Sequence, residues 1–158
     1  YMEISYGHID GIKIGQNFET RQALIDAGMH PHREAGIWGS SKNAACSIVL
    51  SGGYEDDLDE LDFVLYTGHG GQKNKVQVAD QDFSAKRGWG NKGLVISYES
   101  NLPVRVIRGY QIDNGPTSGY RYDGLYYVEK YERVRGKSGY FVCRFYLRSE
   151  LQLSLIHI

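Results

Sequence analysis

Two aromatic side chains and one carboxylate lie close together in the sequence. The run Ser51-Gly-Gly-Tyr-Glu-Asp-Asp57 is followed closely by Tyr66-Thr-Gly-His-Gly-Gly71. Two aromatic rings can sandwich a flat heterocycle, a carboxylate can accept a hydrogen bond from an exocyclic amino group, and glycines let backbone amides approach a ligand edge. These residue types are therefore the parts of a pocket for a base that has been taken out of a DNA stack.

Short strands must position these residues, because most apolar segments are runs of strand length. A helix is expected over residues 21–27, with Thr20 as its N-cap and Gly28 as its stop, and a second helix over residues 91–98. Strands are expected at residues 45–51, 63–67, 104–108, 125–131 and 140–147, the last two forming a hairpin with a longer loop. Strands at this spacing predict a β-rich barrel or sandwich with a helix or two packed outside.

The length of 158 residues fits one domain, which we expect to span residues 1–150, with 151–158 as a tail. No stretch is long enough to cross a bilayer, and the first residues lack a signal pattern. Cys46 and Cys143 lie in apolar runs, so we expect two buried free thiols in an intracellular protein. Without a CxxC pair, these two cysteines do not indicate a zinc framework.

The net charge of −1 does not by itself indicate a nucleic-acid partner, but the distribution of charge is uneven. Residues 1–62 carry 4 basic and 11 acidic side chains, whereas residues 63–158 carry 14 basic and 8 acidic side chains. A folded chain with this asymmetry can present one basic face, provided that the two groups of charges do not intermix in space.

Eight segments, in order along the chain, resemble the SET- and RING-associated (SRA) domain, also called the YDG domain. They are GHIDGIKIGQ, AGIWGS, SIVLSGGYEDD, YTGHGG, ADQDF, PVRVIRG, YRYDGLY and GKSGYFVCRFYL. The resemblance implies a mainly β (α+β) fold, a curved PUA-like β-barrel with one to three peripheral helices. It also implies binding of duplex DNA that contains 5-methylcytosine, with the modified base flipped into a pocket. The motif Tyr122-Asp-Gly124 is expected to be architectural.

Carried over residue by residue, the resemblance implies a role for each pocket position. Tyr54 and Tyr66 would stack on the flipped base, which returns roughly 1–3 kcal/mol per base. Asp57 would accept from the cytosine amino group, and thymine, which lacks that donor, would leave the carboxylate unpaired. The pocket floor and the remaining contact to the base edge would come from Ser51, Gly52, Gly53 and Thr67.

The methyl group would be sensed by shape, because burying one carbon atom yields under about 1 kcal/mol. A tight cavity lined by Ser51 and Gly52 could do this, and a slightly larger cavity would also admit 5-hydroxymethylcytosine.

Loops around the pocket would hold the duplex. The base-displacing position of the family falls on Glu34, which is poorly placed beside phosphates, so either Arg33 or a neighbour would take over this role or the duplex would be held differently. The loop after YTGHGG is short, which argues against a preference for half-methylated sites. Asn74 could reach a base edge. The basic side chains expected to bind phosphates are Lys73, Lys75, Lys86, Arg87 and Lys92, with Arg133, Arg135 and Lys137 in the hairpin loop.

Three functions are consistent with these observations. The leading hypothesis is a non-enzymatic reader of modified duplex DNA that has no catalytic residue, metal or cofactor. A rival is a chain that itself cuts DNA with a metal, motivated by the acidic residues 55–62. However, no ligand set recurs at metal-binding spacing, and apart from Asp57 we expect these acids to form a solvated loop. The third is a PUA-like RNA binder.

The compact loops are most similar to those of bacterial SRA members, which commonly sit beside a nuclease domain in methylation-dependent restriction enzymes. We therefore expect a linked nuclease domain as a candidate neighbour, no membrane partner, and a location in the bacterial cytoplasm, or in the nucleus of a eukaryote.

Overall fold

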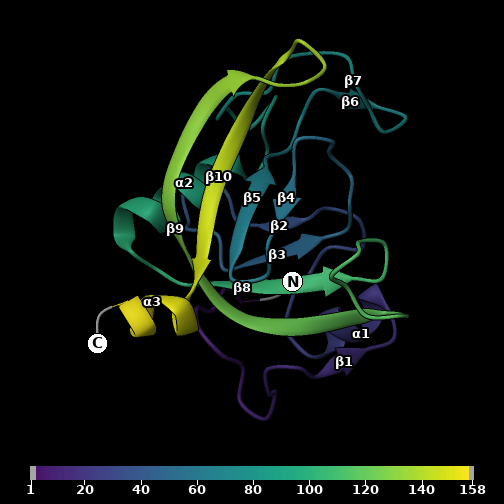
Figure 1. The fold of residues 1–158 in the computed structure, drawn as a ribbon, viewed down its shortest axis with the longest axis vertical. Coiled ribbons are helices and arrows are strands. Elements are labelled where there is room, and N and C mark those ends of the chain that lie inside the picture. The colour runs from purple at the N-terminus through teal and green to yellow at the C-terminus, as the bar shows by residue number, and fades with distance from the viewer. Residues whose placement is uncertain (1–2, 157–158) are drawn as a thin grey trace.

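A strongly curved sheet of eight strands forms the body of the protein in the computed structural model, which describes residues 3–156 (Figure 1). In spatial order its main strands are β2 (Ile37–Trp38), β3 (Ser47–Leu50), β8 (Val104–Gly109), β9 (Tyr120–Arg135), β10 (Phe141–Ser149), β5 (Phe63–Thr67) and β4 (Leu58–Asp59). The short strand β1 (Asn17–Phe18) pairs with β9. A separate ribbon consists of β6 (Gln72–Lys73) and β7 (Val76–Gln77).

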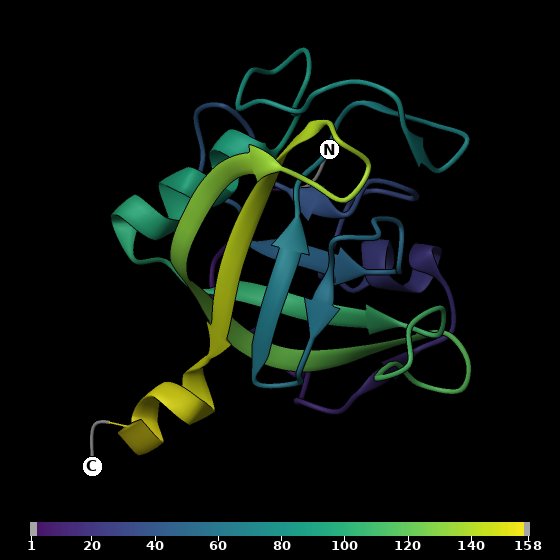
Figure 2. The ribbon, with the colours of Figure 1, turned by 45° about the horizontal axis from the view of Figure 1, so that its top comes forward.

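The long hairpin of β9 and β10 gives the sheet its curvature. β9 pairs with β8 over its first half and with β10 over its second half, so one strand connects the two ends of the molecule (Figure 1, Figure 2). Register shifts occur between Tyr146 and Leu147 in β10 and between Arg105 and Ile107 in β8. Such irregularities bend a strand and increase its twist, which explains the strong curl of this hairpin.

Three short helices accompany the sheet: α1 (Arg21–Asp26), α2 (Asn91–Ser100) and α3 (Glu150–Ile156). α2 packs against β9, and its Leu94 and Val95 belong to the main core. α3 leaves the body of the protein at the end of β10 (Figure 1, Figure 2). None of the helices within residues 3–156 has the length and apolarity needed to cross a membrane.

The predicted mainly β fold with one to three peripheral helices is confirmed. The curved sheet is mixed rather than purely antiparallel, since β3 and β8 run parallel. Its two end strands, β2 and β4, are not paired with each other in the described part of the chain, so the sheet remains open where we expected a barrel.

Both predicted helices are present, and the first has the predicted capping residues. The Thr20 hydroxyl accepts from the Ala23 amide at 3.1 Å, and Gly28 adopts a φ of 77° just beyond α1. Strand β9 begins earlier than predicted because Tyr120 and Arg121 pair with the end of the preceding strand β8 and with β1, which lies about a hundred positions earlier in the sequence. Cys46 and Cys143 are buried free thiols, as predicted, and burial raises their pKa values to about 11 and about 12.

A partly buried ion network, centred on the buried Arg108, ties β4, β8 and β9 together. The Arg108 guanidinium donates to both carboxylate oxygens of Asp59, at 2.7 and 2.8 Å, and to Asp123 at 2.8 Å. Arg121 donates to Asp123 as well, at 2.6 Å. Tyr122 bonds His8 through its hydroxyl at 2.7 Å, and Gly124 has a φ of 99°. The motif at residues 122–124 is thus part of the architecture.

The expectation that the acids of residues 55–62, apart from Asp57, form one solvated loop is wrong for Asp56 and Asp59. Asp59 pairs with Arg108, as described above. Asp56 is buried and accepts from the Lys137 amide at 3.1 Å. Asp62 is exposed, as expected, although it also accepts from the Ser149 hydroxyl at 2.7 Å. The donors come from residues 49 to 87 positions later in the chain, so the sequence around the acids gives no sign of them.

Candidate nucleobase pocket

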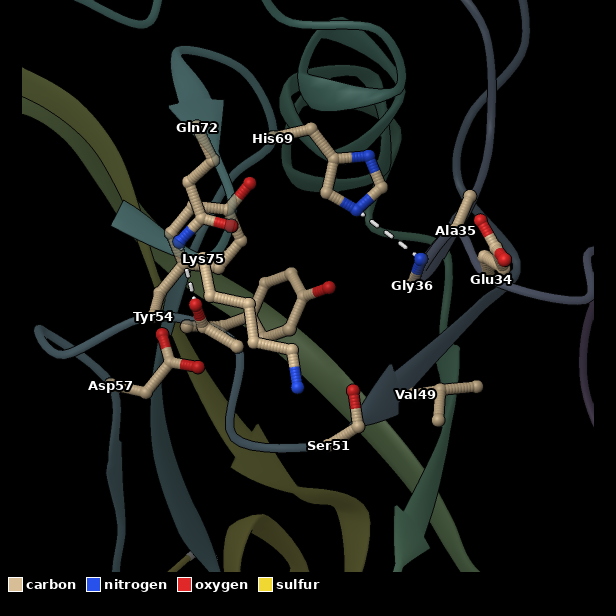
Figure 3. A pocket seen from close by; sticks show the side chains of 12 residues that line it. Glu34, Ala35, Gly36, Val49, Ser51, Tyr54, Asp57, His69, Gln72 and Lys75 are labelled. Atoms are coloured by element: carbon tan, nitrogen blue, oxygen red, sulfur yellow. Dashed lines mark hydrogen bonds between the residues drawn. The ribbon is translucent and has the colours of Figure 1, made fainter. Parts of the chain in front are cut away.

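A cavity of about 520 Å³ opens where the ends of β3 and β5 meet the loop before β2. This volume is within the range of small-ligand pockets, about 300–1,000 Å³. The lining residues are Glu34, Ala35, Gly36, Val49, Ser51, Gly53, Tyr54, Asp57, Tyr66, His69, Gln72 and Lys75. Figure 3 shows Tyr54 and Asp57 on the opposite side of the cavity from Glu34, Ala35 and Gly36. The cavity therefore has an aromatic and acidic wall facing a loop wall.

Both predicted stacking residues line this cavity. Tyr66, near the end of β5, is 4% exposed, and Tyr54 is partly buried in the loop after β3. Burial raises the pKa of each phenol, so both rings are neutral at physiological pH. A Cβ atom placed on Gly36 would lie 2.7 Å from the Tyr66 hydroxyl oxygen, so the loop wall can approach this ring only at a glycine.

Asp57 faces the cavity without a cationic partner among the described residues. Its Oδ1 accepts from the Thr67 amide at 2.6 Å. Burial raises the pKa of Asp57 to about 6, against the opposing effect of the contact with Thr67, and the nearby Asp56 and Asp59 raise it further. At neutral pH the group is a carboxylate that can still accept from a ligand.

The structure separates two of the predicted floor and edge residues from the others. Ser51 and Gly53 line the cavity, whereas Gly52, with a φ of 74°, lines a neighbouring cavity of about 420 Å³. Thr67 is fully buried behind Asp57, where its backbone amide rather than its side chain makes the contact.

His69 was not predicted as part of the pocket, yet it forms one wall. Its Nδ1 bonds the Trp89 carbonyl at 3.1 Å, and its Nε2 lies 3.3 Å from the Gly36 amide. The carbonyl requires the proton on Nδ1, which leaves Nε2 free to accept from Gly36 (Figure 3). Burial lowers the pKa of His69 to about 4, so the ring stays neutral and holds the loop at neutral pH. The only sequence signal was its position between glycines in the pocket motif.

Hydrogen bonds to its backbone carbonyls fix the loop that carries Glu34. The Arg21 guanidinium donates to three carbonyls of this loop, at His32 (2.8 Å), Glu34 (3.1 Å) and Ala35 (3.2 Å). His30, which is fully buried, bonds the Ala35 carbonyl at 2.8 Å. The position of Glu34 at the rim of the cavity is therefore determined by contacts from α1 and from its own loop.

The β6–β7 ribbon supplies the other rim. The Gln72 side chain, also missed from sequence, donates to the Gly53 carbonyl at 2.6 Å and ties the ribbon to the pocket floor. Asn74 and Lys75 form its two-residue turn, with φ values of 53° and 65°. In Figure 3 the Lys75 side chain extends across the cavity with its amine directed toward Ser51. Lys73 is exposed on the same ribbon.

The other predicted DNA-contacting cations lie in different surroundings. Arg33 is exposed and bonds the Gln22 side chain, and Arg87 is exposed in the loop before α2, whereas Lys92 is partly buried on α2. The hairpin-loop cations bond backbone carbonyls: Arg133 that of Gln81, Arg135 that of Gly139, and Lys137 that of Glu55. Within residues 3–156, no group of three or more His, Cys, Asp or Glu side chains is arranged to hold a metal ion.

Comparison with known proteins identifies relatives over nearly the whole chain. The rat E3 ubiquitin-protein ligase UHRF1 is 36% identical over 165 aligned residues, which cover 92% of this chain and 21% of UHRF1. The Arabidopsis thaliana H3 lysine-9 specific histone-lysine N-methyltransferase SUVH6 is 40% identical, with 90% of this chain and 19% of SUVH6 covered. The chain thus spans about a fifth of the length of these relatives.

Solved structures with the same fold include one nuclease and one DNA complex. The modification-dependent TagI restriction endonuclease matches with a TM-score of 0.88 and 43% identity, over 94% of this chain and 53% of that one. The SUVH5 SRA domain bound to fully hydroxymethylated CG DNA matches with a TM-score of 0.78 and 37% identity, over 92% and 94% of the two chains. The SAD/SRA domain family matches residues 5–152, which confirms the resemblance seen in the motifs, and the chain belongs to this family.

Proposed function

We propose that this chain binds duplex DNA containing 5-methylcytosine or 5-hydroxymethylcytosine. It would enclose the flipped base in the cavity described above, which is lined by Tyr54, Asp57 and Tyr66. The observation that carries this proposal is the placement of Tyr54, Tyr66 and an unpaired Asp57 around a single cavity. The SUVH5 domain, which this chain matches over 94% of its length, binds hydroxymethylated DNA in its structure.

The energetics of the cavity fit a flipped cytosine. Extruding a base costs a few kcal/mol in lost pairing and stacking. Contact with the rings of Tyr54 and Tyr66 would return roughly 1–3 kcal/mol. Asp57 would add a charge-assisted hydrogen bond from the amino group, which thymine cannot offer. Together these terms can offset the cost of extrusion for cytosine, whereas thymine would lack the hydrogen bond to Asp57.

We further propose that the chain supplies recognition and not catalysis. The TagI relative is a restriction endonuclease, and this chain covers 53% of it, which leaves room for a separate nuclease domain in that protein. Incubation of modified duplex with this chain and magnesium or manganese is expected to leave the DNA intact. Metal-dependent cleavage that a pocket variant such as Asp57→Asn abolishes would contradict the proposal.

Titration of labelled duplexes tests the recognition step. We expect tighter binding of a duplex with one 5-methylcytosine than of the same duplex with cytosine, and weak competition by single-stranded RNA. Tyr54→Ala should remove most of this preference because it removes one stacking surface. Lys73→Ala, the matched control on the exposed ribbon, should weaken both duplexes alike. Equal affinity of the unaltered chain for both duplexes would reject the proposal.

A further inference from the structure

We infer that Trp89, with Lys86, Arg87 and Lys92, forms a second DNA-contact surface, which binds the strand flanking the flipped nucleotide. We call these four residues the Trp89 surface. The inference rests on the proposed function, because it concerns the duplex that would deliver a base to the pocket. It assigns a role to the one exposed tryptophan of the described chain.

Trp89 is exposed and yet held rigidly. It is 40% exposed, whereas Trp38, the other tryptophan, is 8% exposed. Its two neighbours are buried glycines without room for a side chain. A Cβ atom on Gly88 would lie 1.7 Å from the Asp82 carbonyl oxygen. Gly90 has a φ of 89°, and a Cβ atom placed on it would press against the Ile37 side chain. The backbone on both sides of the indole is therefore fixed, which preorganises an exposed aromatic ring for binding.

One buried side chain ties this loop to the pocket wall. The Asn91 amide donates to the carbonyls of His69 and Asp82, both at 2.9 Å, and its Oδ1 accepts from the His69 amide at 2.7 Å. Asn91 is fully buried. The loop before α2 and the pocket residue His69 are thus held in one arrangement.

The indole lies one ring away from the cavity. Trp89 and His69 are nearly parallel, with ring centroids 6.3 Å apart and an interplanar angle of 10°. The His32 ring meets Trp89 edge-on, with a centroid distance of 4.9 Å. Since His69 lines the cavity, a strand that places one nucleotide in the pocket brings its neighbours within reach of Trp89.

The charges around Trp89 favour a polyanion. Lys86 and Arg87 are exposed and Lys92 is partly exposed, and none of the three forms an ion pair within the described residues. Asp82 lies close to Arg87, and its carboxylate accepts from Ser84. The three cations attract phosphates, while the indole offers an apolar face to a deoxyribose or a base. This combination fits a DNA strand.

Protection of the indole tests the contact directly. Subtracting the emission of the Trp89→Phe variant from that of the unaltered chain isolates the Trp89 signal without altering the buried Trp38. With saturating duplex, we expect acrylamide to quench this signal less, and the emission itself to shift or weaken. Unchanged emission and unchanged quenching at saturation would overturn the inference. Because this readout needs only bound DNA, it remains informative if modified and unmodified duplexes bind equally.

Affinity measurements separate a DNA contact from an indirect effect on the pocket. Trp89→Ala should weaken modified and unmodified duplexes by the same factor, about five- to 150-fold, which corresponds to the roughly 1–3 kcal/mol of one aromatic contact. Trp89→Tyr should retain most of the affinity. Tyr98→Ala, which removes an aromatic ring of similar exposure (44%) from the far part of α2, should have no effect.

The cations should be visible in the salt dependence. The double variant Lys86→Ala, Arg87→Ala should reduce the slope of log affinity against log salt by about two, roughly one for each phosphate contact. If Trp89→Ala lowered only the affinity for modified duplex, and the double variant left the slope unchanged, the indole would act through His69 and the pocket, and the inference would be wrong.

Discussion

Asp57 and Asp59 are separated by one residue but lie in opposite electrostatic surroundings. Asp59 makes two hydrogen bonds with the Arg108 guanidinium, whose side chain is 2% exposed. Asp57 has no cationic partner in the described chain, faces the cavity, and has a pKa raised to about 6 by burial. The same short segment thus provides one carboxylate that is satisfied within the fold and one that is left for a ligand.

The two carboxylates therefore differ in role: Asp59 contributes to stability, and Asp57 is available to a ligand. The Asp59 site belongs to a network with Asp123 and Arg121 that joins three strands, so its charge balance is complete without a ligand. The Asp57 site has one backbone donor, from Thr67. A buried carboxylate with an incomplete set of partners costs the folded chain free energy, and a bound amino group would offset that cost.

The largest expected effect concerns the stability that the paired carboxylate, Asp59, gives to the fold. Arg108→Met leaves Asp59 and Asp123 without their shared cation, and we expect the free energy of unfolding to fall by about 3–5 kcal/mol. Urea denaturation measures this. Arg148→Met, which breaks a more exposed ion pair with Glu129, should cost under about 1 kcal/mol. Similar losses in the two variants would show that the Arg108 network is not special.

The second prediction concerns the pH dependence of stability. The folded pKa of Asp57, about 6, lies above its ordinary value of 3.8, so the ionised group disfavours folding above pH 6 and this penalty disappears as the pH falls toward 4. Asp57→Asn should therefore stabilise the chain at pH 7, by up to about 3 kcal/mol at 1.36 kcal/mol per pKa unit. Urea denaturation at pH 7 and at pH 4.5 should show this difference shrinking. A gain that is independent of pH would contradict the assigned cause.

The third prediction concerns the affinity for DNA. Asp57→Asn should weaken binding of a 5-methylcytosine duplex by about 10- to 100-fold, since a buried donor loses its charged acceptor. Its affinity for unmodified duplex should stay nearly constant, as measured by fluorescence anisotropy. Asp59→Asn is the matched control: it should lower stability but keep the ratio of the two affinities. The comparison would fail if Asp59→Asn changed the ratio of the two affinities and Asp57→Asn did not.

The smallest expected effect concerns a hydroxyl group that bonds Arg108 in the ion network. Tyr126→Phe removes a hydroxyl that donates to the Leu61 carbonyl at 2.6 Å and accepts from Arg108 at 3.3 Å. We expect a loss of about 0.5–1.5 kcal/mol in the free energy of unfolding, the usual net value of a hydrogen bond. Affinity for either duplex should not change. A loss of DNA binding would indicate that the network and the pocket are coupled.

Much of the local structure could be predicted because its causes are local. Thr20 and Gly28 bound the first helix through a side-chain cap and a left-handed turn, both of which depend on neighbouring residues. The strand at residues 63–67 was predicted with its observed bounds, because its apolar run is short and clearly delimited. The family motifs also located Tyr54, Asp57 and Tyr66, which the structure brings to one cavity.

The missed residues depend on distant contacts. His69 and Gln72 join the pocket by bonding Gly36 and Gly53, which lie 33 and 19 positions earlier in the chain. Gly52 and Thr67 were also predicted to belong to the pocket, but Gly52, in a left-handed turn, lines the neighbouring cavity and Thr67 is fully buried in its strand. Proximity in sequence predicted the right segment but not which of its residues line the cavity.

The sequence by itself determined the fold family, the main elements and the chemical types available to the pocket, because motifs, caps and apolar runs are properties of neighbouring residues. The tertiary structure alone decided which of two nearly adjacent carboxylates is paired with Arg108 and which is left facing a cavity. The physical reason is that the surroundings of a charge depend on strands folded beside it from far along the chain, and these set both its pKa and its availability to a ligand.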